Sequence, residues 1–254
     1  MKPIHVILLN VTICWIMGVQ FVSAQTEASH LREKKITIHM SKKPLATVFA
    51  RLIYKYDVPI GFEESAFDKN HNHYDFETNV PPTDLKKEYA ADRDFISSYP
   101  KFTEHLLTLD FDDESLATVI DSIVRQMQNY SWQERNGVIN IFPNKGRDPI
   151  FQRLLDLPIN RFNLSKGAKV GFIQGDLYDL PEIRDFFNRN KVMLVTERGY
   201  SLLFIDRPLE QNLDFGTLKF GELLNRITAC KRGGWIIRQG KDRVTNEKTI
   251  ELLI

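Results

Sequence analysis

The sequence contains little cysteine, with Cys14 and Cys230 as the two in 254 residues. Cys14 lies in an N-terminal apolar run that we expect to be removed, so Cys230 remains alone and no internal disulfide can form. The working chain must therefore be stabilised by packing. Cys230 falls between apolar positions of an expected helix, and we predict it to be a small buried residue rather than a nucleophile.

The sequence also lacks an excess of either charge. Removing residues 1–24 removes Lys2 and no acidic residue, which leaves 33 basic and 33 acidic residues in 230. A balanced chain has no electrostatic attraction to nucleic acid or to an anionic membrane surface. We therefore expect no nucleic-acid partner.

Recognisable catalytic motifs are missing as well. There is no glycine-rich phosphate loop, no GxSxG and no HExxH, and residues 171–175 lack the dinucleotide spacing. The densest acidic cluster is Asp110, Asp112, Asp113 and Glu114. Paired carboxylates can act as acid and base, but a position just before a helix favours capping. The sequence thus predicts no catalytic or cofactor-binding residue and a protein that is not an enzyme.

What is present begins with an export signal. Lys2 precedes an apolar run over 4–22, Val22-Ser23-Ala24 offers small residues at its end, and a polar stretch follows. This pattern predicts a signal peptide, residues 1–24, that is cleaved. The alternative is a retained membrane anchor, because the run approaches spanning length. No cationic cluster follows it, which favours cleavage and a chain without a membrane span.

A strand tripeptide recurs three times, each time four residues before an apolar residue that begins a helix. The copies are Ile38-His39-Met40 before Leu45, Leu109-Asp110-Phe111 before Leu116, and Leu213-Asp214-Phe215 before Phe220. Each helix repeats apolar residues at i, i+3, i+4 and i+7, which predicts one face packed on a sheet. Ser41 in one copy, and the acids with Ser115 in another, have the chemistry of helix caps.

Strands close each unit, and two units end in a hairpin that carries a tryptophan. Trp132 precedes an Asn136-Gly137 turn, and Trp235 begins the last hairpin. Either indole could form a stacking surface for a sugar or a base. Their equivalent places in the repeat favour packing in the core instead.

A fourth, less regular unit completes the pattern, with a strand over 160–164, a helix opened by Leu180-Pro181-Glu182 and a strand over 192–195. The sequence therefore predicts an α+β fold of tandem βαβ-βαββ modules, with helices packed on small mixed sheets. The first module covers 25–143, a linker covers 144–158, and the second module covers 159–254.

A polar insertion, 63–106, distinguishes the first module. His71 and His73 flank Asn72 within it, and two histidines with a nearby carboxylate can bind a metal. A solvated polar loop explains the same residues, so we predict no metal and no cofactor and keep these histidines as the candidates. A short helix is expected near 84–89. The alternative function is a small exported enzyme or metal-binding protein, with this insertion as a lid over a cleft between the modules.

One family shares this arrangement. The residues that carry the likeness are Ile36-Thr37-Ile38, Pro44-Leu45, Val48-Phe49, Leu52 and Val58-Pro59-Ile60-Gly61-Phe62. This stretch resembles the short N-terminal domain of secretins and TonB-dependent receptors, and the later repeats share its frame. The resemblance implies a recognition or assembly module of the bacterial periplasm, not an enzyme, whose partner is an unknown envelope protein. Secretion is the alternative location. We expect no barrel or pore to follow, so transport roles do not carry over.

Overall fold

The computed structural model describes residues 31–65, 77–78, 106–195, 200–201, 208–241 and 248–254. The expected signal peptide, His71, His73 and the helix expected near 84–89 lie outside these ranges. The described residues form helices and mixed sheets, which confirms the α+β class. None of the described helices is long and apolar enough to cross a membrane.

The first half of the chain forms the predicted βαβ and βαββ units. Its elements are β1 (Lys35–Pro44), α2 (Leu45–Tyr56), β2 (Ile60–Glu63), β4 (Leu106–Ser115), α4 (Leu116–Met127), β5 (Tyr130–Arg135) and β6 (Val138–Pro143). Ile36, Ile38 and Met40 are buried on alternate positions of β1, because successive side chains of a strand point to opposite faces. The predicted apolar stripe of α4 is buried, from Leu116 to Met127.

The second half repeats this plan with additions. Its elements are α5 (Pro149–Leu155), β7 (Pro158–Ile159), β8 (Phe162–Leu164), α6 (Val170–Tyr178), α7 (Pro181–Asn190), β9 (Met193–Val195), β10 (Tyr200–Ser201), β11 (Leu213–Phe215), β12 (Leu218–Lys219), α8 (Phe220–Lys231), β13 (Gly234–Lys241) and β14 (Lys248–Leu253). The expected linker contains α5, which Asp148 caps through the backbone N–H of Ile150. Helix α6 was not predicted.

Both halves contribute to one six-stranded sheet, whose strand order is β5-β6-β2-β13-β14-β9. In the first half, the closing hairpin β5–β6 is followed by β2, the last strand of the βαβ unit. In the second half, the closing hairpin β13–β14 is followed by β9 in the same way. Strand β2 lies parallel to both β6 and β13, whereas β13 lies antiparallel to β14, and β14 parallel to β9. The second set of three strands therefore runs in the reverse direction to the first.

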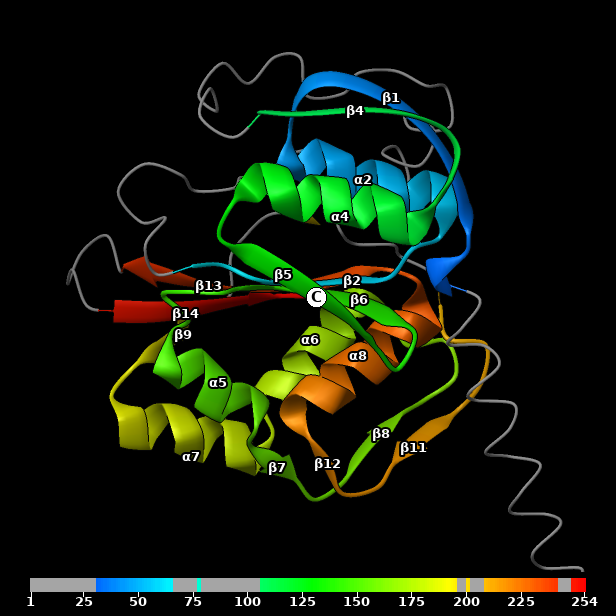
Figure 1. Cartoon of the computed structure of the whole chain (residues 1–254). Coiled ribbons are helices and arrows are strands. Elements are labelled where there is room, and N and C mark those ends of the chain that lie inside the picture. Colours follow the sequence, from blue (N-terminus) through cyan, green and yellow to red (C-terminus); the bar gives the residue numbers. More distant parts are fainter. Residues whose placement is uncertain (1–30, 66–76, 79–105, 196–199, 202–207, 242–247) are drawn as a thin grey trace, which may run out of the picture.

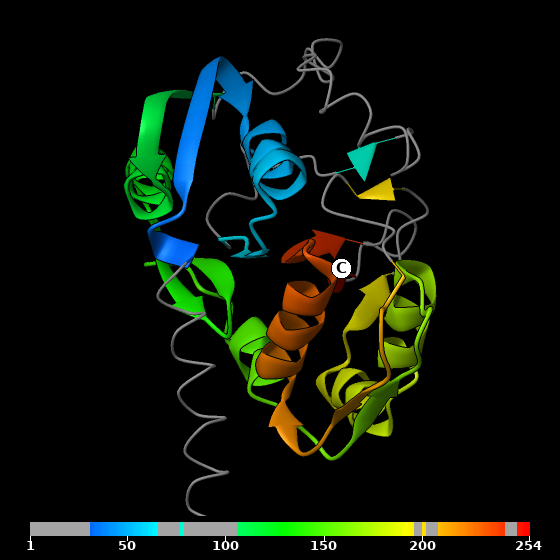
Figure 2. The ribbon, with the colours of Figure 1, turned by 90° about the vertical axis from the view of Figure 1, so that its right-hand side faces the viewer.

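Reversing a set of strands within a sheet also reverses its faces, so the helices of the two halves cover opposite faces. Figure 1 shows α2 and α4 on one side of the sheet and α5 to α8 on the other. Figure 2 shows the same separation from the side, with α2 and α8 on opposite sides of the red C-terminal strand. The chain is thus layered around a central sheet that both halves build.

This layering gives two hydrophobic cores, one on each face of the six-stranded sheet. Ile236 and Leu253 from the second half pack in the core beneath α2 and α4. Their neighbours Ile237 and Leu252 pack in the core of α5 to α8. Because alternate residues of β13 and β14 serve different cores, the two halves are interlocked.

Two-stranded ribbons form the outer layers. β1 pairs antiparallel with β4, and the ribbon they form covers α2 and α4 (Figure 1). In the second half β8 pairs with β11, and β7 pairs with β12, also antiparallel. Within the expected insertion, Glu77–Thr78 (β3) pairs with β10 of the second half. The helices α2 and α4 therefore lie between two β layers.

The two repeated units that end in a hairpin also share a hydrogen bond between the hairpin tryptophan and the preceding helix. The indole Nε1 of Trp132 donates to Asp121 Oδ1 at 2.7 Å, and that of Trp235 donates to Asn225 Oδ1 at 2.8 Å. Asp121 and Asn225 each occupy the sixth position of their helix, α4 and α8. The two tryptophans are therefore equivalent, as the sequence predicted.

Three local predictions were wrong. Strand β1 continues to Pro44, which is the N-cap of α2 and gives no side-chain hydrogen bond, so Ser41 is not a cap. In the second copy Ser115 alone accepts from an N–H of the first turn, that of Thr118, because β4 continues through the acids. Cys230 is exposed on α8, where partial burial raises the pKa of its thiol.

Candidate functional site

A cleft of about 530 Å³ lies where strands of the first half meet helices of the second half. We call it the inter-half cleft. Its charged lining residues are Glu63, Arg135, Arg147, Asp156, Lys219 and Glu222. Its amide lining residues are Gln133, Asn136, Asn140, Gln152 and Asn225. Leu155, Gly221 and Trp235 complete the wall, so the cleft is predominantly polar.

The floor of the cleft is the face of β2, β5 and β6 that turns away from α2 and α4. Ile139 and Ile141 of β6 pack in the first core, so Asn140 between them points to the other face. On β2 the same alternation places Phe62 in the core and Glu63 in the cleft. Glu63 and Asn140 are only 5% and 8% exposed, so the floor is polar and buried.

The charged groups of the cleft are mostly paired. Arg147 holds the Glu63 carboxylate with two hydrogen bonds, from Nε at 2.7 Å and from Nη2 at 2.5 Å. Lys219 Nζ lies 2.8 Å from Asp156 Oδ1, and this contact raises the pKa of Lys219, with a smaller contribution from Glu222. Bidentate pairing of an arginine with a carboxylate fixes both groups, which shapes the cleft before any ligand enters.

The amides of the floor are partly used within the protein. Asn140 Nδ2 donates to the carbonyl of Val138 at 3.0 Å. Asn225 Oδ1 accepts from the indole of Trp235, as described above. The other polar group of each amide has no hydrogen-bond partner among the described residues. Neither atom is among the buried side-chain atoms that lack a partner, so both are open to the cleft, where a ligand can reach them.

This arrangement is better suited to binding than to acid–base chemistry. Glu63 and Asp156 are each held by a cation, and Glu222 accepts from the backbone N–H of Lys219 at 3.3 Å, where it caps α8. All three carboxylates of the cleft are thus committed to contacts within the protein. The cleft offers fixed hydrogen-bonding groups around a preformed space, whose volume is in the range of small-molecule sites.

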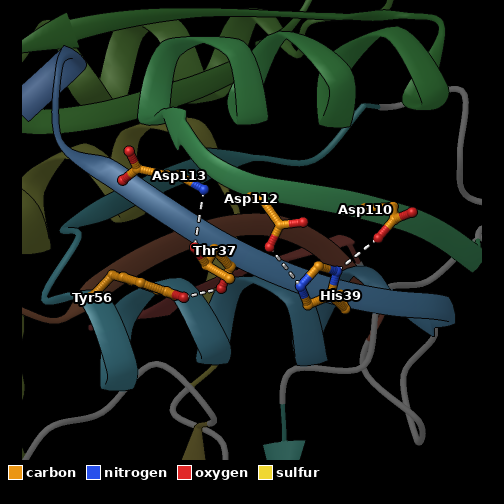
Figure 3. Close-up of polar contacts among 6 residues, drawn as sticks. All are labelled: Thr37, His39, Tyr56, Asp110, Asp112 and Asp113. Carbon is orange, nitrogen blue, oxygen red and sulfur yellow. Dashed lines mark hydrogen bonds and ion pairs between the residues drawn. The ribbon is translucent and has the colours of Figure 1, made fainter.

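A second polar cluster lies on the outer face of the β1–β4 ribbon. His39 Nδ1 is 2.7 Å from Asp110 Oδ1, and His39 Nε2 is 3.2 Å from Asp112 Oδ1 (Figure 3). The hydrogen bond to Asp110, together with the charge of Asp112, raises the pKa of His39. The described residues contain no group of three metal-binding side chains placed to hold an ion. The cluster links the two strands by contacts at the surface, and these are ion pairs when His39 is protonated.

On each strand of the ribbon, the backbone of one residue is bonded by a side chain from the helix beneath it. Tyr56 of α2 donates its hydroxyl to the carbonyl of Thr37 on β1 (Figure 3). On β4, Thr108 donates its N–H to Gln126 Oε1 at 3.0 Å, and its carbonyl accepts from Gln126 Nε2 at 2.9 Å. Side chains that occupy edge groups oppose the addition of a further strand.

The candidates from the sequence are mostly elsewhere. His71 and His73, the candidates for metal binding, lie outside the described residues. The acidic cluster lies on β4, away from the cleft. Trp132 carries Arg32 over its ring at 4.8 Å, and Trp235 is 2% exposed, so neither indole is an open stacking platform.

Apart from Asn136 and Trp235, the cleft residues were not identified from the sequence. One signal was present: Asn140 interrupts an apolar run, and a lone amide inside a buried strand has to find polar neighbours. The other side of the cleft comes from α5 and α8. These helices lie near β6 because the strands of both halves form one sheet, which the sequence did not reveal. No protein-family model, curated protein or solved structure matches this chain.

Proposed function

We propose that this chain is an exported, non-catalytic binding or assembly module of the bacterial cell envelope. We further propose that it holds its partner at the inter-half cleft. The observation that supports this most is the cleft itself, whose buried polar floor comes from one half and whose walls come from the other. A partner bound there contacts both halves at once.

Two further features support the proposal. The repeated units resemble the short N-terminal domain of secretins and TonB-dependent receptors, which serves in recognition and assembly. The side chains bonded to the backbone of the β1–β4 ribbon disfavour binding by strand addition there. The cleft, by contrast, offers a partner hydrogen-bonding groups from both halves of the chain.

The two tryptophans allow a direct test, because Trp235 lines the cleft and Trp132 does not. A chain that starts at Gln25 contains these two tryptophans alone, so ¹⁵N-labelled tryptophan gives one reporter signal and one internal control. On addition of a bacterial envelope fraction, we expect the indole signal of Trp235 to shift and that of Trp132 to stay. The shift should persist for hours, because a binding protein does not consume its partner.

A matched pair of variants completes the test. Gln152→Ala removes an exposed amide of α5 that lines the cleft, and Asn188→Ala removes an exposed amide of α7 that does not. We expect the first to weaken the shift and the second to leave it unchanged. An unshifted Trp235 signal would contradict the proposed site, and a shift that reverts as a component of the fraction is converted would identify an enzyme.

A further inference from the structure

The inter-half cleft presents a hydrogen-bond donor and an acceptor from two buried amides. The Asn140 amide, whose Nδ2 is bonded to Val138, is left with its Oδ1 as an acceptor within the described part of the chain. Asn225, whose Oδ1 is occupied by Trp235, is left with its Nδ2 as a donor. Asn140 is 8% exposed and Asn225 is 4% exposed. A hydroxyl group both donates and accepts, so a ligand with several hydroxyl groups can bond each of these amides.

The charge of the cleft argues for a neutral ligand. Three acidic and three basic side chains line it, so their formal charges cancel. The two ion pairs already described, Glu63 with Arg147 and Asp156 with Lys219, account for four of the six. An anion would have to compete with a carboxylate for two of the three cleft cations, Arg147 and Lys219. A cation would have to compete with these two residues for Glu63 and Asp156.

The lining also disfavours a peptide. Peptides are ordinarily recognised by pockets for apolar side chains or by pairing with a strand edge. Leu155 and Trp235 are the apolar side chains of this cleft, and the Trp235 indole is committed to Asn225. Five amides surround this small apolar surface. Several amide groups close together can form hydrogen bonds with a ligand that carries several hydroxyl groups.

We infer that the inter-half cleft binds a short, neutral glycan. This inference rests on the proposed function and specifies the chemical class of its partner. Hydroxyl groups of the sugar would satisfy Asn140 Oδ1 and Asn225 Nδ2, while the rest of the ring lies among the remaining amides. The volume of about 530 Å³ is in the range of small-molecule sites, so a short saccharide fits and a long chain extends out of the cleft.

The test uses the ¹⁵N indole signals of Trp235 and Trp132 with defined probes. The probes are cellotriose, maltotriose and the trimer of N-acetylglucosamine, each titrated into the chain that starts at Gln25. We expect at least one to shift Trp235 in a saturable way without moving Trp132. Asn140→Leu keeps the size of the side chain but removes the acceptor, and it should weaken that binding about tenfold. Asn188→Leu, outside the cleft, should not.

An envelope fraction separates failure of this inference from failure of the proposed function. Periodate cleaves vicinal diols of sugars, and proteinase K digests proteins. A glycan is supported by a Trp235 shift that survives proteinase K treatment of the fraction but not periodate treatment, or not lysozyme treatment for 4-linked N-acetylhexosamine chains, which lack internal vicinal diols. A shift abolished by proteinase K alone would overturn the glycan and leave the proposed function standing. If neither the untreated fraction nor the three sugars shift Trp235, both are overturned.

Discussion

The indole of Trp235 lies directly against the backbone of Gly61, across the junction between the two halves. These residues are Cα partners in the parallel pairing of β13 with β2. A Cβ added to Gly61 would lie 2.4 Å from Trp235 Cε2. The indole cannot easily withdraw, because it is buried and bonded to Asn225. Glycine at this position therefore allows the two halves to share one sheet.

Gly61→Ala should lower the free energy of unfolding by about 2–3 kcal/mol, the usual cost of overpacking a rigid core. Urea denaturation followed by circular dichroism measures it. Gly175→Ala is the matched control, because a Cβ there has no neighbour within 4 Å outside its own helix backbone. It should raise stability by about 0.5–1 kcal/mol. If Gly61→Ala costs as much in a Trp235→Leu background as in the parent, the contact is not the cause.

The equivalent tryptophans should respond differently to loss of their hydrogen-bond acceptor. Asn225→Leu leaves the Trp235 N–H buried without a partner, which should cost about 1–3 kcal/mol. Asp121→Leu exposes the N–H of the partly buried Trp132 to water, so the loss should be smaller. Urea denaturation of both variants gives the comparison. Equal losses would argue against the difference in burial.

The helix C-caps give a stabilising prediction. Lys191 ends α7 in the left-handed region, at φ 49° and ψ 46°, where a residue with a Cβ is strained. Lys191→Gly should therefore raise the unfolding free energy by about 0.5–1 kcal/mol. Arg184→Gly, in the interior of the same helix, should lower it by a similar amount. A loss at both positions would contradict the expected strain at Lys191.

His39 predicts a pH dependence of stability. Its pKa is raised above the usual 6.5, first by the hydrogen bond to Asp110. A raised pKa means that the folded state holds the proton more tightly than the unfolded state, so this contribution is complete below pH 6.5 and is lost as pH rises through the raised pKa. The stability difference between the parent and His39→Gln should shrink over that interval. An NMR titration that gives a pKa at or below 6.5 for His39 would refute it.

Export remains a prediction that N-terminal sequencing can check. Expressed with its leader in a Gram-negative host, the protein should be recovered from the periplasm with Gln25 as its first residue. A protein that retains Met1 and sediments with the membrane would instead be anchored by the apolar run.

Much of the fold could be predicted because each element of the repeat is determined by residues that are close together in the chain. Alternation around Ile38 and Leu109, the helical stripes after them, and the Asn136-Gly137 turn each depend on residues close together in the chain. The equivalence of Trp132 and Trp235 also followed from position alone. These features were confirmed because local pattern and packing agree.

The features that the sequence did not reveal depend on distant contacts. Gly61 and Trp235 meet only in the folded sheet, and their pairing decides that the halves share it and that their helices cover opposite faces. The acids near Asp112 were interpreted as caps because the strand was expected to end before them. Strand β4 instead continues through them and pairs with β1, where His39 meets these acids. The cleft residues come from both halves, so no single stretch could show them.

Hydrogen–deuterium exchange with the envelope fraction tests the central claim most directly. Binding at the inter-half cleft should slow exchange in two segments that are distant in sequence, 133–140 from the first half and 219–225 from the second. The β1–β4 ribbon, over 35–41 and 108–114, should be unaffected and serves as the control. Joint protection of the two segments is the predicted result. Protection of the ribbon alone, or of neither segment, would contradict the account.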